Sequence, residues 1–496
     1  MKKYIFFPTD EKHWLNVARK LYEDKVAEPV LWLGDDRHFI EAKKIFGNNV
    51  YQDLIHRHRN YNIQDTNYNG EYEDFFTSEN YLRAKDRCIK MMDRIDLYGI
   101  FGRLDREIYF HNLLITYLKK IYNSKPDVLI TSENPHDHAK YIIYEICDFL
   151  NIPAFKFHNL NLLPLIFLQN IKSGVNISKP SKISSRINNL LLEDIDTYIK
   201  KLKKEDKNYE LHYMKYQRIN SKLLPSIINF FKKDFIKILK DTKHNTEMLL
   251  SSTYNPINPF RLNLATRYFI KYKRKKNLSH ASSHSSEQIE DNINYVYFPL
   301  HYEPEKTTNP DGGIFHDQFI ALVKLRKFLP EDIHIIVKEH PSQLYSHFFG
   351  HRGRSPLFYK LIKNIKGLKL VDIKEDSLKL LKNSLFIATI TGSMAIEASV
   401  LGKKSLIFGN AWHQGCPNSF KWSKKLTYDD INNADLEPTS ETSKFLIKLM
   451  ESYAIPGFIN GVQRKYFIQY ADSEFELHQN NSLYELLKKF FKEDLT

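Results

Sequence analysis

The chain has 496 residues, more than one hydrophobic core accommodates, and its length predicts two domains of ordinary size with additional elements. Hydrophobic residues make up 42% of the chain, which is typical of a globular protein, and no window holds the roughly 18–20 uncharged apolar residues that span a bilayer. The net charge of +14 is compatible with nucleic acid, an anionic membrane or an anionic substrate as a partner. The three cysteines lie far apart in the sequence, which argues against a disulfide framework or a zinc cluster and favours a reducing compartment.

The first part of the chain alternates short apolar runs with helical patterns. The opening run is too short for a secretory signal and is predicted to be a strand. Strands separated by helices of about ten to fifteen residues indicate βαβ units on a parallel sheet. Strands are predicted at 3–8, 29–34, 126–132 and 152–158, and helices at 11–24, 37–47, 107–124 and 139–151.

The middle of the chain, residues 172–292, is polar, basic and helical in character. Residues 261–278 contain seven basic residues and no acidic one. Residues 279–288, "SHASSHSSEQ", are small and polar and are predicted to form a linker. The lysines and arginines around 228–276 alternate with aromatic and aliphatic residues, which fits an anionic membrane surface, an acidic glycan or an ordinary solvated helical face.

The βαβ rhythm then resumes and continues almost to the C-terminus, where 481–495 forms an amphipathic helix. The sequence therefore predicts an α/β fold with two Rossmann-like domains facing each other across a cleft. The predicted divisions are 1–171, a basic helical insertion at 172–292, a second domain at 293–475 and a terminal helix at 476–496. Strands are predicted at 295–300, 333–340, 368–372, 385–390 and 404–409, with helices at 316–329, 356–365, 377–384 and 393–402.

Ligands of open parallel sheets bind beyond the C-terminal ends of the strands, so the segments there are candidate sites. The loop 301–318 contains Gly312 and Gly313, whose backbone N–H groups could approach a phosphate, although such a pair is also common in plain turns. Gln318 ends this loop and joins the candidates. In "IHIIVKEHPSQ", Lys338 and His340 come at the end of a strand that Pro341 terminates, so His340 either donates to a phosphate or serves as a packing residue.

The segment "TITGSMAIEASVLG" provides a third candidate. Gly392 permits a tight turn from strand to helix, and Ser393 is predicted to cap the helix beside Thr391. Glu397 lies one helical turn later on the same face, where a carboxylate can accept both hydroxyls of a ribose. The alternative is a structural turn followed by a solvated glutamate.

In the first half, "TSENPHDHAKYIIYEI" places Glu133, His136 and Asp137 just before a helix. A carboxylate beside a histidine in a cleft can abstract a proton from a sugar hydroxyl, but Asp137 is equally suited to cap the helix. Asp35 and Asp36 could form a metal-binding pair, and a βα turn is the preferred interpretation.

Taken together, "YFPLHYEPEKTTNPDGGIFHDQ", "VKEHPSQ", "ATITGSMAIEASVLGKKSLIFGNAWH" and "ENPHDHAKYIIYEICDFLNIP" resemble bacterial capsule or surface-polysaccharide biosynthesis proteins. That family resembles glycosyltransferases of the GT-B architecture, and its relatives include Kdo transferases and GT-B sialyltransferases. The resemblance is clearest over 295–415, while 172–292 matches no known family.

The resemblance implies that His340 contacts the phosphate of the donor and that Thr391, Gly392, Ser393 and Glu397 hold the nucleotide. It implies a catalytic base from the N-terminal domain, with Asp137 preferred and Glu133 and His136 as rivals. No convincing Asp-x-Asp metal site faces these loops, which predicts a metal-independent reaction with no cofactor other than the nucleotide-sugar donor. A CMP-linked sugar such as Kdo or another nonulosonate is favoured, and UDP- or GDP-sugars remain open.

The predicted function is transfer of a sugar to a growing capsule or surface polysaccharide. The expected partners are the donor and a glycan or lipid-linked glycan acceptor, without nucleic acid. A cytoplasmic location is expected, with peripheral contact with the anionic inner membrane as an open option. The alternatives are a CDP-polyol phosphotransferase of the teichoic-acid type and a non-catalytic glycan-binding assembly protein.

Overall fold

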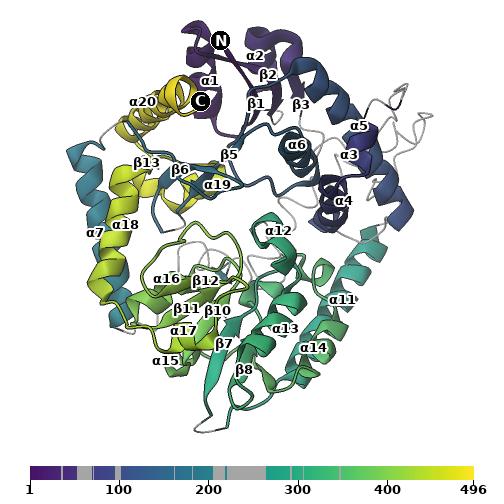
Figure 1. Ribbon diagram of the computed structural model, residues 1–496, viewed down its shortest axis with the longest axis vertical. Helices are drawn as coiled ribbons and strands as arrows, with labels where there is room; N and C mark the ends of the chain where they lie inside the picture. Colours follow the sequence, from purple (N-terminus) through teal and green to yellow (C-terminus); the bar gives the residue numbers. More distant parts are fainter. Residues whose placement is uncertain are drawn as a thin grey trace.

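The computed structural model describes residues 1–34, 37–52, 70, 72–94, 102–160, 162–180, 183–204, 218–219, 264–290, 293–304, 307–345 and 348–495. These residues form two α/β domains, each built on a sheet whose central strands are parallel (Figure 1). The predicted fold class is therefore confirmed. Within the described ranges, no helix is long and apolar enough to cross a bilayer.

The first sheet consists of β1 (Lys2–Phe7), β2 (Ala27–Gly34), β3 (Val50–Gln52), β4 (Val128–Thr131), β5 (Ala154–Asn159), β6 (Leu165–Asn170) and β13 (Ile455–Pro456). Their order is β13-β6-β5-β4-β1-β2-β3. The strands from β3 to β5 are parallel, whereas β6 is antiparallel to both of its neighbours. Strand β1 is the middle one of the five parallel strands and is apolar over its buried residues, as expected for a strand covered by helices on both faces.

The second sheet consists of β7 (Tyr295–Pro299), β8 (His334–Lys338), β9 (Leu368–Val371), β10 (Phe386–Thr389), β11 (Lys404–Ile407) and β12 (Ser419–Lys421). All six strands are parallel, in the order β12-β11-β10-β7-β8-β9. The strand order reverses between β7 and β10. After β7 the chain adds β8 and β9 on one side of β7, and then it adds β10, β11 and β12 on the opposite side.

Helices cover both faces of each sheet. In the first domain, α5 and α6 pack on one face, and α1 and the C-terminal helix α20 (Ser473–Lys489) pack on the other. In the second domain, α11, α13 and α14 cover one face, and α15 and α16 cover the other. The first-domain helices are α1 (Lys12–Glu23), α2 (Phe39–Phe46), α3 (Glu73–Phe76), α4 (Glu79–Met91), α5 (Arg103–Ser124) and α6 (His138–Phe149). The second-domain helices are α11 (Leu264–Ser285), α12 (Thr308–Asp311), α13 (Gln318–Phe328), α14 (Pro356–Lys363), α15 (Ser377–Asn383), α16 (Met394–Val400) and α17 (Tyr428–Asn432).

The C-terminal segment returns to the first domain. Strand β13 extends the first sheet, and α20 (Ser473–Lys489) packs against α1 (Figure 1). A further core joins β6 and α16 to α7 (Ser185–Lys203), α18 (Thr439–Ser452) and α19 (Gly461–Tyr466), so these helices bridge the domains. The division predicted at 475 thus differs from the structure, because a two-residue strand gives no signal in the sequence.

The predicted linker at 279–288 is wrong over its first seven residues, which continue α11 to Ser285. Ser282 and Ser285 are buried, and their small side chains let the helix lie close to the second domain. A run of small polar residues indicates a linker in sequence, but the same residues allow close packing when one helical face is covered.

Candidate functional site

The predicted nucleotide-binding segments lie where the strand order of the second sheet reverses. The loop after β7 begins at Leu300, and the turn after β10 contains Thr391, Gly392 and Ser393. In doubly wound sheets, ligands bind outside the carboxyl ends of the strands at this switch point. The sequence predicted that the 391–393 turn follows a strand. The sheet topology shows that this strand, β10, is one of the two strands between which the order reverses.

His301 follows β7 and contacts the turn directly, although sequence reasoning did not single it out. Its Nε2 accepts from the N–H groups of Ile390 (3.3 Å) and Thr391 (3.5 Å), so the proton of the neutral ring is on Nδ1. Burial and the nearby His340 and Arg354 lower the pKa of His301 to about 3. The strand-end rule that selected His340 would also have selected His301, because this residue directly follows the predicted strand 295–300.

His340 follows β8, the neighbour of β7, and its ring is held as a neutral donor. The backbone N–H of Ser342 donates to Nδ1 at 3.2 Å, which leaves the ring proton on Nε2. Burial and the positive charges of Lys338 and Arg354 lower the pKa of His340 to about 4. His340 and the 391–393 turn therefore lie at the same edge of the sheet, with His301 between them.

A buried ion pair supports both histidines. Arg354 Nε donates to Glu339 Oε2 at 2.9 Å, and the two side chains are only 3% and 0% exposed. Arg354 also donates to the carbonyl of His301 at 2.9 Å, and the N–H of His340 donates to Glu339 Oε1 at 2.8 Å. Tyr359 donates to Glu339 Oε2 at 2.8 Å. This network fixes the two loops relative to each other.

The turn after β10 presents donors that have no acceptor among the described residues. The N–H of Gly392 donates to Thr389 Oγ1 (3.1 Å), and a Cβ at Gly392 would lie 2.6 Å from that oxygen. The next two N–H groups, of Ser393 and Met394, have no acceptor within the part of the chain that the structure describes. The prediction that the Ser393 side chain caps the helix is wrong, because its hydroxyl makes no capping bond and its backbone is helical.

Glu397 lies one helical turn beyond Ser393 and is partly buried. Burial raises the pKa of its carboxyl to about 7, and no described residue donates a hydrogen bond to it or forms an ion pair with it. A carboxylate that no described residue contacts in this way, one helical turn from the N–H groups of Ser393 and Met394, is suited to accept from the hydroxyls of a bound sugar or ribose.

Lys338 and Gln318 have internal partners. Lys338 Nζ donates to Ser377 Oγ at 2.7 Å, and burial lowers the pKa of Lys338 to about 8. Gln318 accepts from the N–H of His301 at 2.9 Å and donates to Glu303 Oε1 at 3.0 Å. Both side chains are nearly inaccessible, so these contacts indicate that they support the loops rather than contact a ligand.

The Gly312–Gly313 pair forms a packed turn. The N–H of Gly312 donates to the carbonyl of Thr308 at 2.8 Å, and a Cβ at Gly312 would lie 2.5 Å from that oxygen. Gly313 has a φ of +58°, which favours glycine. Helix α13 is capped by Asp317, which accepts from the N–H of Phe319. The N–H of Gly312 is therefore not available to a phosphate, contrary to the prediction. The two glycines instead allow the chain to turn.

In the first domain, Asp137 caps α6. Its Oδ1 accepts from the N–H of Lys140 at 2.8 Å, and Lys140 Nζ lies 3.2 Å from its Oδ2. Burial alone would raise the pKa of Asp137, but Lys140 and the neighbouring His136 and His138 hold it below its usual value. The geometry thus favours the capping interpretation and counts against Asp137 as a base.

The carboxylate of Glu133 makes longer contacts with its neighbours than the carboxylate of Asp137 does. Its Oε1 lies 3.6 Å from Lys140 Nζ and 3.7 Å from His136 Nε2, and the side chain is 20% exposed. His136 Nδ1 lies 2.7 Å from the carbonyl of Asn134, so it donates to that oxygen and leaves Nε2 facing Glu133. Of the three predicted catalytic residues, Glu133 has the carboxylate best placed to accept a proton.

The carboxyl ends of the two sheets meet at Asp311. Asn134 Nδ2 and Lys156 Nζ, both from the first domain, donate to the Asp311 carboxylate at 2.8 and 2.6 Å. A Cβ at Gly409 would lie 2.9 Å from the carbonyl of Asp311 and 2.7 Å from Thr391 Cγ2. Asp311 therefore links Asn134, the neighbour of Glu133 in the chain, to Gly409 and the Thr391 turn.

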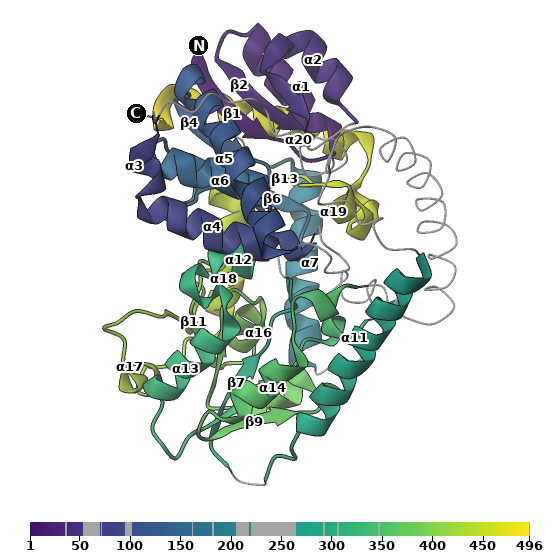
Figure 2. The same cartoon turned by 90° about the vertical axis from the view of Figure 1, so that its right-hand side faces the viewer.

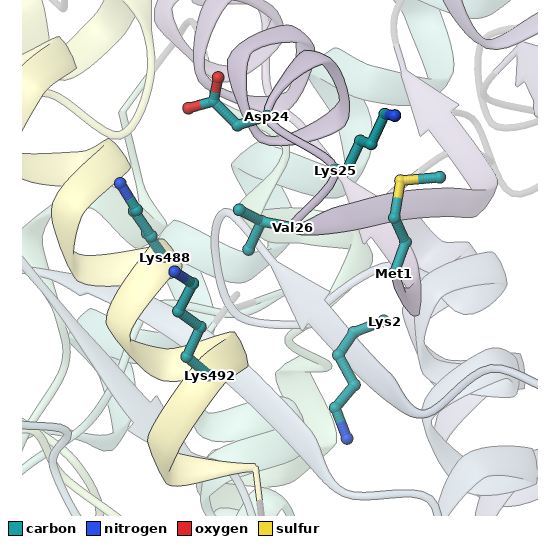
Figure 3. A pocket seen from close by; sticks show the side chains of 7 residues that line it. All are labelled: Met1, Lys2, Asp24, Lys25, Val26, Lys488 and Lys492. Atoms are coloured by element: carbon teal, nitrogen blue, oxygen red, sulfur yellow. The ribbon is translucent and has the colours of Figure 1, made fainter.

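A groove of about 670 Å³ lies elsewhere, between the start of β1, the end of α1 and the C-terminal helix (Figure 3). The groove is lined by Met1, Lys2, Asp24, Lys25, Val26, Lys488 and Lys492. This lining is rich in lysine and includes none of the predicted site residues. The candidate pair Asp35 and Asp36 lies outside the described residues. Within the described part of the chain, no three His, Cys, Asp or Glu side chains gather as a metal site would require.

No family model and no curated protein matches this sequence. Similar solved structures include the β-Kdo 2,7 and 2,4 transferases of Thermosulfurimonas dismutans KpsC, at 13% and 15% identity and TM-scores of 0.21 and 0.23. The matches cover 36% and 35% of this chain and span only 62% and 53% of the transferase chains. The UDP-GlcNAc 2-epimerase of Methanocaldococcus jannaschii matches at 14% identity and a TM-score of 0.22. This match covers 95% of the present chain and 99% of the epimerase chain. Similarity at this level identifies no family and says nothing about activity.

Proposed function

We propose that the protein is a glycosyltransferase that binds a nucleotide-activated sugar at the switch point of the second sheet. One observation carries the proposal: neutral imidazole donors converge there, beside the first domain, with backbone N–H groups and a carboxylate that have no partner among the described residues. Donors fixed before the reaction stabilise the negative charge that develops on a departing phosphate. We assign the phosphate to His340 and the N–H groups of Ser393 and Met394, with His301 beside them.

The remaining roles follow from the same geometry. Glu397 accepts from the hydroxyls of the ribose, and Glu133 removes the proton of the acceptor hydroxyl as the anomeric carbon gains cationic character. A CMP-linked donor such as Kdo or another nonulosonate, a metal-independent reaction and a glycan or lipid-linked glycan acceptor complete the proposal. Two alternative functions are a phosphotransferase of the teichoic-acid type and a non-catalytic assembly protein. Measurements of nucleotide binding and a donor screen distinguish them from the glycosyltransferase.

Nucleotide binding tests the proposal first. A ligand that binds only the folded protein raises its melting temperature by mass action, so CMP should raise Tm more than CDP, UDP or GDP. A donor screen with mass detection of the glycan product then identifies the transferred group. Preference for CDP with transfer of a polyol phosphate would establish the phosphotransferase, and indifference to every nucleotide would leave the assembly protein.

His340→Ala should abolish the nucleotide-dependent rise in Tm, because the variant lacks the Nε2–H donor. Since the pKa of His340 is lowered to about 4, its contribution should not change between pH 6 and 8. His334→Ala is the matched control, because His334 occupies the opposite end of the same strand. Equal loss in both variants would mean that strand β8, rather than the imidazole at its end, determines binding.

Glu397→Gln should affect binding and stability in opposite directions. Burial raises the pKa of Glu397 from 4.5 to about 7, so the folded protein holds this proton more tightly than the unfolded chain. The stabilising contribution of the neutral form is complete below pH 4.5 and is lost as the pH rises through 7. Glutamine stays neutral, so the variant should gain about 1–3 kcal/mol relative to wild type between pH 5 and 8.

Wild-type nucleotide binding should strengthen over the same pH range, because the ionised carboxylate accepts hydroxyl hydrogen bonds more strongly than the protonated form. Glu397→Gln should bind weakly throughout. Urea unfolding and nucleotide titration at each pH measure the two effects. Glu485→Gln, at an exposed position on α20, is the control. A flat difference in stability with pH would contradict the assignment.

A further inference from the structure

Helix α11 is strongly basic and lies at the outer edge of the second domain (Figure 2). Its 22 residues include no aspartate or glutamate and contain six basic residues: Arg267, Lys271, Lys273, Arg274, Lys275 and Lys276. No pair at i and i+4 neutralises these charges within the helix, so α11 carries a net positive charge.

One face of α11 is occupied by the protein. Lys275 Nζ donates to the carbonyl of Tyr345 at 2.7 Å, and Lys271 Nζ lies 4.3 Å from the centre of the Phe349 ring. Leu278 is 1% exposed and belongs to the core of the second domain. This face orients the helix and determines which residues point outward.

The opposite face combines aromatic rings with lysines. Phe269 and Tyr272 are 60% and 62% exposed, and Lys273 and Lys276 are exposed beside them. These positions are separated by three, four and seven residues, so they form a continuous stripe along the helix. Lys273 Nζ lies 5.5 Å from the centre of the Phe269 ring, which brings charge and apolar surface into one patch.

We propose that this stripe is a docking surface for an anionic lipid bilayer. Lysines are attracted to anionic headgroups, and aromatic rings enter the boundary between headgroups and acyl chains. A hydrated acidic glycan would neutralise the lysines but has no apolar interior for Phe269 and Tyr272, so the exposed rings favour the bilayer. The lysine groove of Figure 3 lacks this combination, because its lining contains no aromatic residue.

None of the four stripe residues is assigned to the nucleotide site, so the role of the stripe does not depend on the identity of the donor. Contact through α11 would hold the second domain at the membrane, where a lipid-linked acceptor is found. The charges act within about 10 Å at 0.1 M salt, whereas insertion of the rings is insensitive to salt. The two contributions can therefore be measured separately.

Vesicle sedimentation with the full-length protein tests the proposal. Phosphatidylglycerol–phosphatidylcholine vesicles should bind the protein, and vesicles of phosphatidylcholine alone should bind it weakly. Lys273→Gln/Lys276→Gln should weaken binding roughly 30-fold at low salt, from about 1 kcal/mol for each charge near the surface. Phe269→Ala/Tyr272→Ala should weaken it roughly tenfold at both low and high salt, because apolar area is lost.

Lys488→Gln/Lys492→Gln is the matched control, since it removes the same charge from the groove in Figure 3 and should leave vesicle binding unchanged. Equal losses in the control and the α11 lysine variant would show nonspecific attraction and overturn the proposal. Full binding by the aromatic variant together with equal binding to a soluble acidic polysaccharide would assign α11 to a glycan. All variants should keep the nucleotide-dependent rise in Tm, so failure of the docking surface is distinguishable from failure of the nucleotide site.

Discussion

Replacing Glu133 with glutamine should slow sugar transfer by roughly 10²–10⁴-fold, the usual contribution of a general base. Glutamine keeps the shape of the side chain but cannot take the proton of the acceptor hydroxyl. The variant should still bind nucleotide, because Glu133 belongs to the first domain and the assigned phosphate donors belong to the second. Mass-detected product formation at saturating donor gives the rate, and the nucleotide-dependent rise in Tm gives binding.

Asp137→Ala provides the comparison, because this carboxylate precedes the same helix and caps it. Loss of the cap should lower stability by about 1 kcal/mol and leave most of the transfer activity. If Asp137→Ala stops transfer in a folded protein while Glu133→Gln remains active, the two roles are exchanged and the preference drawn from the sequence was correct.

The contrast between Glu133 and Asp137 shows one limit of sequence reasoning. An aspartate just before a helix has the same local pattern whether it caps that helix or serves as a base. The deciding facts are the distances from its oxygens to Lys140, which depend on the fold of the helix. The same holds for Gly312, where a glycine suited to a phosphate loop turned out to fill a packed turn.

Most of the parallel strands were predictable because their buried residues form continuous apolar runs, whereas β3 and β12, of three residues each, were missed. This regularity also located the strand ends, and with them His340 and the 391–393 turn. The strand-order reversal beside His301 was not predictable in the same way, because it depends on which strands pair. Strand β13 escaped prediction for a related reason, since two residues acquire their place only through pairing with β6.

Arg354→Met should strongly destabilise the second domain, with an expected loss of about 3–5 kcal/mol. Arg354 and Glu339 are almost fully buried, so removing the guanidinium leaves an ionised carboxylate whose only donors among the described residues are Tyr359 and the N–H of His340. Urea unfolding monitored by tryptophan fluorescence measures the loss. Arg186→Met is the control: Arg186 pairs with Asp472 at the surface, so its removal should leave the unfolding midpoint nearly unchanged.

The double variant Arg354→Met/Glu339→Gln separates the burial of a charge from the loss of packing. If the uncompensated carboxylate is the main cost, removing it should recover part of the stability, and the two substitutions will be strongly non-additive. Nucleotide binding should remain impaired in the double variant, because the His301 carbonyl still lacks the donor that Arg354 provides. Recovery of stability together with full nucleotide binding would show that the ion pair stabilises the domain without positioning the histidines.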